Sequence, residues 1–182
     1  AWCWGENDGG QAGGTAPLVL TETEVVGLPA ATVTEIAPGY LTTCALVDGD
    51  AWCWGDVSVI GNATEPAGCV DLASARACPP TRVVRGPAPF VRVVTSAHAG
   101  AACALDDTRR LWCWGSGVSA EPVVFGDFSA AAEVTDIALG EWNFCAIVDG
   151  DVWCAGWNLH GELGNGRAED VRTNILGPVL WP

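Results

Sequence analysis

Residues 44–55 have the sequence CALVDGDAWCWG. Two apolar runs joined by Asp48 and Gly49 strongly indicate a β-hairpin, because both central residues of a type I′ turn take positive φ. Counting outward from that turn places Cys44 opposite Cys53, at a non-hydrogen-bonded position where Cα atoms lie about 4.5 Å apart. That separation suits a disulfide, so the stretch predicts a hairpin with a cross-strand disulfide.

Both halves of this hairpin recur along the 182-residue chain. The second half, Trp-Cys-Trp-Gly, stands at 2–5, 52–55 and 112–115, and a Trp-Cys-Ala-Gly variant stands at 153–156. The first half, Cys-Ala-Leu or Cys-Ala-Ile, precedes the last three copies at 44–46, 103–105 and 145–147. A second Asp-Gly turn pairs Cys145 with Cys154, and a three-residue turn pairs Cys103 with Cys113. Register alone therefore predicts three cross-strand disulfides.

Further β-like runs lie upstream of each hairpin. The nearer runs cover 32–37, 91–95 and 134–138, and the farther runs cover 24–26, 82–84 and 122–125. Four short strands recurring every 40–60 residues, roughly, are typical of propeller blades. The sequence therefore predicts an all-β fold: a partial β-propeller of about three to four four-stranded blades with cross-strand disulfides. We expect one repeat domain over 1–182, with repeats at approximately 1–50, 51–110, 111–151 and 152–182, the last incomplete.

The recurring order resembles the regulator-of-chromosome-condensation (alpha-tubulin suppressor-like) repeat family, in its cysteine-bearing, secreted bacterial-type form. The Gly-rich loops at 6–14 and 157–166 carry the resemblance beyond the hairpins. Aligning the repeats places His98 where the neighbouring repeats have Gly39 and Gly140. The resemblance implies a propeller that usually has seven blades, so we expect this chain to be a segment of a longer propeller. It also implies protein partners, as in nucleotide exchange on a nuclear GTPase or inhibition of β-lactamase.

Nine cysteines in a Gly-rich chain predict a disulfide framework and an oxidising location, whether extracellular, periplasmic or at the cell surface. The chain has no Cys-x-x-Cys pair and two histidines, which argues against a zinc site. Cys69 and Cys78 lie in one long loop and pair by elimination. Cys3 is then the odd cysteine. We expect it to be a free thiol or to form a disulfide with an external strand.

Charge and motifs exclude several classes of function. The formal net charge of −14 disfavours nucleic acid, and no apolar run is long enough for a transmembrane segment. The turns at 48–50 and 149–151 offer too few carboxylates for calcium, and no Gly-rich loop is followed by the Lys of a phosphate-binding loop. We therefore expect no metal, no cofactor and no enzyme activity. Asn62 begins a glycosylation sequon whose use the sequence leaves open.

Candidate binding residues lie outside the repeated motif. The repeated Trp residues are expected to pack between blades. Trp142 and Trp157, together with Asn158, His160 and Glu162 of the 157–167 loop, are the candidate protein-binding residues. The diverged loops at 56–80 and 116–121 are further candidate surfaces, because recognition is often carried by variable loops on a rigid scaffold.

Three functions remain open from the sequence. The first is an extracellular or cell-surface protein–protein interaction module. The second is a structural segment of a surface assembly or filament, or an accessory subunit of a larger complex, whose sheet edges pair with neighbours. The third is a secreted enzyme inhibitor.

Overall fold

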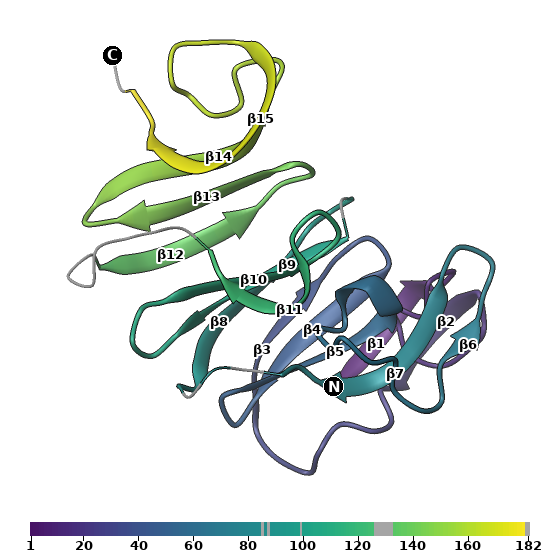
Figure 1. Ribbon diagram of the computed structural model, residues 1–182. Helices are drawn as coiled ribbons and strands as arrows, with labels where there is room; N and C mark the ends of the chain where they lie inside the picture. The colour runs from purple at the N-terminus through teal and green to yellow at the C-terminus, as the bar shows by residue number, and fades with distance from the viewer. Residues whose placement is uncertain (85, 87, 99, 126–132, 181–182) are drawn as a thin grey trace.

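A computed structural model of the chain describes residues 1–84, 86, 88–98, 100–125 and 133–180, with the backbone alone for 170–176. The described residues form four antiparallel sheets and one 3₁₀ turn, η1 (Val57–Val59). The sheets follow one another along an arc, with β1 in the sheet at one end and β15 in the sheet at the other (Figure 1). This is the expected all-β partial propeller, without ring closure.

The sheets contain two to five strands each. The first holds β1 (Trp2–Glu6) and β2 (Leu18–Glu24). In spatial order, the second holds β3 (Val33–Pro38), β4 (Thr42–Val47), β5 (Asp50–Asp56), β7 (Arg76–Arg82) and β6 (Val70–Asp71). The third holds β11 (Ser119–Val124), β10 (Leu111–Gly115), β9 (Ala101–Asp106) and β8 (Phe90–Thr95). The fourth holds β12 (Val134–Leu139), β13 (Asn143–Val148), β14 (Asp151–Asn158) and β15 (Glu169–Pro178).

The hairpin register predicted from the turns is confirmed. β4 and β5 pair Cys44 with Cys53, and β13 and β14 repeat that register. Asp48 and Gly49 take φ of 49° and 78°, as a type I′ turn requires. In the third sheet the turn is one residue longer, and Arg109 takes the left-handed conformation at φ 66°.

Four disulfides hold the sheets, in the same pairs that the sequence predicts: Cys44–Cys53, Cys69–Cys78, Cys103–Cys113 and Cys145–Cys154. Each joins Cα atoms 4.1 Å apart. The Cys69–Cys78 bond ties the long loop to β7, and β6 pairs with β7 directly after Cys69. This sheet therefore has a fifth strand that the four-stranded expectation did not include.

The core lies between consecutive sheets. The Cys44–Cys53 disulfide packs with Trp114 of the third sheet, and Trp54 packs on the opposite face with Val25, the residue that follows β2. Successive side chains of a strand point to opposite faces, so one motif supplies both contacts. The sheets span 2–24, 33–82, 90–124 and 134–178, whereas the repeats run from motif to motif. Each sequence repeat therefore joins the end of one sheet to the start of the next.

Among the described strands, β1 pairs with β2 alone, so its other edge is free. Cys3 is unpaired among the described residues and half-buried, and burial raises the pKa of its thiol, so the thiol stays protonated at neutral pH. Trp2 and Trp4 are 59% and 66% exposed. That a cysteine-bearing strand of a longer propeller pairs with this edge stays a prediction.

Replacing Cys145 and Cys154 together with alanine should lower the free energy of unfolding by about 2–3 kcal/mol, because the disulfide closes a short loop in the unfolded chain. Urea unfolding without reductant measures the loss. Cys3→Ala is the matched control, because it removes a thiol but no cross-link, and it should change stability by less than about 1 kcal/mol. Equal stability of the double variant and the wild type would contradict the prediction that this disulfide stabilises the fold.

Candidate functional site

Three loops, each joining the first and second strands of its sheet, contact one another in series along the arc. They connect β3 to β4, β8 to β9 and β12 to β13. The Tyr40 backbone N–H donates to the Ser96 carbonyl at 3.3 Å. The Ser96 hydroxyl in turn donates to the carbonyls of Gly140 and Glu141, at 3.0 and 3.3 Å. These joining loops are therefore fixed to one another across three sheets.

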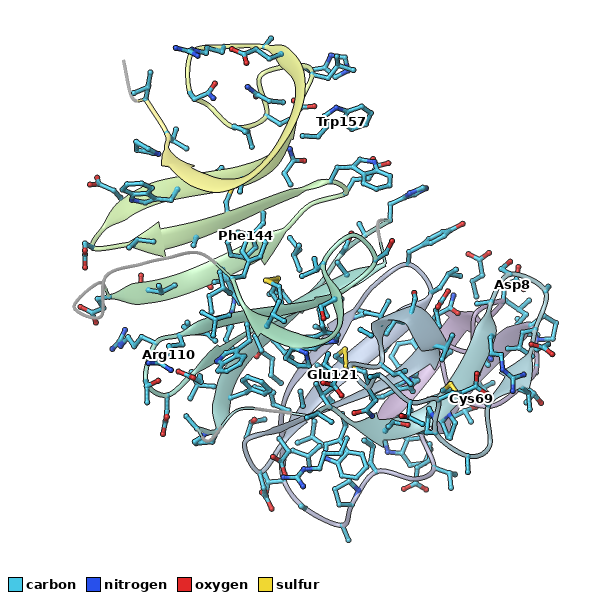
Figure 2. The ribbon with its side chains drawn as sticks, viewed as in Figure 1. Asp8, Cys69, Arg110, Glu121, Phe144 and Trp157 are labelled. Atoms are coloured by element: carbon cyan, nitrogen blue, oxygen red, sulfur yellow. A yellow bond between two sulfur atoms is a disulfide. The ribbon has the colours of Figure 1, made fainter. Side chains whose placement is uncertain are left out.

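The joining loops and the end of β14 bring four rings into a line, which we call the aromatic row: Tyr40, His98, Trp142 and Trp157. Tyr40 stacks on His98 with ring centroids 5.1 Å apart. His98 lies 6.2 Å from Trp142, and Trp142 meets Trp157 edge to face at 6.2 Å. Figure 2 shows the Trp157 side chain at the end of β14, beside the loop that leads to β15.

Backbone and carboxylate contacts hold the row in place. The Trp157 N–H donates to the Trp142 carbonyl at 3.1 Å, and the Asn143 side-chain amide donates to the Trp157 carbonyl at 2.5 Å. Glu141 accepts a hydrogen bond from the Trp142 indole at 2.9 Å, and the same carboxylate oxygen lies 3.6 Å from Nδ1 of His98. One carboxylate thus contacts two neighbouring rings.

The row is accessible to a partner. Tyr40 is 51% exposed and the His98 side chain 56% exposed, while Trp142 and Trp157 are half-buried. Rings with an apolar body and a polar edge, held rigidly in partial exposure, are typical of the residues that dominate protein–protein interfaces.

The 157–167 loop is organised by a buried asparagine. The Asn158 side chain is 3% exposed; it accepts from the Leu163 N–H at 3.1 Å and donates to the Arg167 carbonyl at 3.1 Å. Asn7, in the loop after the first Trp-Cys-Trp-Gly motif, makes the same two bonds, to Ala12 and Ala16. The Asn158 amide therefore shapes its own loop, as Asn7 does.

His160 and Glu162 are exposed in the same loop. The Glu162 carboxylate accepts from the backbone N–H of His160 at 2.8 Å. Bonds from its own and the His160 backbone N–H hold the pKa of Glu162 below its ordinary value. The contact is to the His160 backbone and closes a turn of the loop.

The structure thus brings together Trp142 and Trp157 and leaves the other candidates in their loop. Tyr40 and His98 were not among the candidates. The alignment of His98 with two glycines was wrong: Gly39, Ser96 and Gly140 make the equivalent bonds to Thr42, Ala101 and Asn143. The loop after Ser96 is two residues longer than its neighbours, and this extension places His98 against Tyr40.

The Asn62 amide is also engaged, since it donates to the Arg82 carbonyl at 3.1 Å and accepts from the Val84 N–H at 3.3 Å. Within the described part of the chain, no three His, Cys, Asp or Glu side chains gather as a metal site would need. The same residues contain no helix with the length and apolar character of a membrane span.

No protein-family model and no curated protein matches the sequence. Solved structures do match. The chain is similar to human WBSCR16, with a TM-score of 0.78 and 22% identity over 98% of this chain and 48% of that one. It is similar to yeast RCC1 (Prp20) in a complex with Kap60, with a TM-score of 0.77 and 20% identity over 97% of this chain and 45% of that one.

The fold is RCC1-like. A second structure of Prp20p, from Saccharomyces cerevisiae, gives a TM-score of 0.54 at 18% identity, over all of this chain and 59% of that one. The chain spans about half the length of the first two structures.

Proposed function

We propose that this RCC1-like segment is a protein-binding module and that its partner docks on the aromatic row. The observation that carries the proposal is the row itself, which presents four aromatic rings from the joining loops of three sheets and the end of β14. Interfaces concentrate their binding energy in such rings. The structure of yeast RCC1 (Prp20) with Kap60 gives a precedent for protein binding by the fold.

The proposed location is an oxidising one: extracellular, periplasmic or at the cell surface. Four disulfides support it, because reducing compartments do not maintain such bonds. A net charge of −14 supports a protein partner with a basic surface over nucleic acid.

Trp142→Ala should weaken binding of the partner about 30-fold, as loss of a central interface aromatic does. The partner is first recovered from the source organism on the immobilised chain and identified by mass. Purified partner is then titrated against each variant by calorimetry. Thermal unfolding of each variant shows that the propeller segment is intact.

Trp4→Ala is the matched control for this titration, because it removes an exposed Trp of the first sheet that lies outside the row. It should leave affinity unchanged. Loss of affinity in Trp4→Ala with full affinity in Trp142→Ala would refute docking on the row.

Loss of affinity in Trp4→Ala alone would favour the other candidate function. In that case the chain is a structural segment that joins a larger assembly through β1. Its supporting observation is the exposed edge with Trp2 and Trp4. Solution mass separates the two, since an edge-pairing segment self-associates and a monomeric binder does not.

A further inference from the structure

A cavity of about 210 Å³ lies between the second and third sheets, directly beneath the first two rings of the aromatic row. Tyr40 and His98 form part of its wall. Thr42 at the start of β4, Asp56 at the end of β5 and Ser58 of η1 form another part. Stacking at 5.1 Å holds the Tyr40 and His98 rings together beside it. The cavity is therefore a built concave site with two aromatic walls.

The cavity is acidic. Asp56 is the only carboxylate among its described lining residues, and no Lys or Arg lines it. One oxygen of Asp56 accepts from the Ser58 N–H at 2.7 Å, which fixes the orientation of the carboxylate. Glu141, whose carboxylate lies 3.6 Å from His98, adds a second negative charge next to the rings. The electrostatic field here favours a cation.

We propose, building on the protein-binding function above, that this cavity receives an arginine side chain of the partner protein. The guanidinium stacks against the Tyr40–His98 pair and donates to the Asp56 carboxylate. A planar cation with five fixed donors meets both requirements at once. An ammonium ion is compact and does not stack on a ring face in this way. An anion would face Asp56 and Glu141.

The probe is N-acetyl-arginine amide, added to the ¹⁵N-labelled chain with its disulfides intact. Amide signals of Asp56, Ser58 and Gly100 should shift in a saturable way, with a dissociation constant in the millimolar range. N-acetyl-citrulline amide has the same shape without the charge, and it should produce no saturable shift. Equal shifts with citrulline would overturn the assignment of a cation site.

Asp56→Asn tests the carboxylate while keeping the bond to Ser58, because Asn is also a good cap. This change should weaken probe binding about fivefold or more. Glu121→Gln removes one negative charge from an exposed site on β11, outside the cavity, and should not change binding. If both variants weaken probe binding equally, the effect comes from net charge alone and the site is refuted.

The two proposals can fail separately. If the probe does not bind but Trp142→Ala still weakens partner binding, the arginine site is rejected and the proposed function stands.

Discussion

Gly115→Ala is expected to remove about 4 kcal/mol of the free energy of unfolding, enough to unfold much of a marginally stable chain. Gly115 has φ 101°, where a Cβ is strained. A Cβ there would also lie 2.5 Å from the Gly100 carbonyl oxygen and 2.9 Å from the Ala101 Cα. These are backbone atoms of the neighbouring strand and its loop, so they cannot swing aside as a side chain could.

The same crowding is found at the equivalent glycine of two other copies of the motif. Gly55 and Gly156 also have positive φ, and a Cβ on either would overlap the backbone carbonyl of Leu41 or Trp142. In every copy, the strand register shifts between the Cys and this Gly, which marks a β-bulge. The last residue of Trp-Cys-Trp-Gly is therefore fixed by the close approach of the joining loop.

Gly5→Ala is the control that separates the two causes. Gly5 has φ 111°, yet nothing lies within 4 Å of the position of a Cβ. It should cost about 1–2 kcal/mol, from backbone strain alone. Guanidinium unfolding of both variants gives the comparison, and equal losses at the two positions would show that crowding by the joining loop contributes nothing.

The parts of the fold that could be predicted are local ones. The pairing of Cys44 with Cys53 follows from an Asp-Gly turn and the two-residue period of strands, so it needs no knowledge of distant residues. The fifth strand, β6, could not be predicted from the repeat, because the loop that contains it occurs in one sheet alone.

The aromatic row could not be predicted, because its members stand at different positions of their repeats. Tyr40 stands four residues before its Cys, His98 five and Trp142 three, so no single alignment column contains them. Their contact depends on how consecutive sheets stack. The role of Asn158, by contrast, could have been predicted. It occupies the same place in its repeat as Asn7, and a residue that recurs in this way indicates a structural role.

Trp114→Ala should cost about 3–5 kcal/mol, as removal of a fully buried large aromatic does. The Trp114 side chain is 0% exposed, and its indole donates to the Val59 carbonyl at 2.8 Å. Trp54 repeats the arrangement one sheet earlier, donating to the Gln11 carbonyl at 2.9 Å. In both cases the second Trp of the motif donates a hydrogen bond to the loop that follows the Trp-Cys-Trp-Gly motif of the preceding sheet.

Two further variants divide this cost into its causes. Trp114→Phe keeps most of the packing and loses the bond to Val59, so it should cost about 1–3 kcal/mol. Trp4→Ala changes the same motif position where the ring is 66% exposed, and it should cost less than about 1 kcal/mol. Urea unfolding of the three variants tests the order. A Trp4→Ala loss as large as that of Trp114→Ala would mean that another sheet covers β1 in solution, as the longer propeller requires.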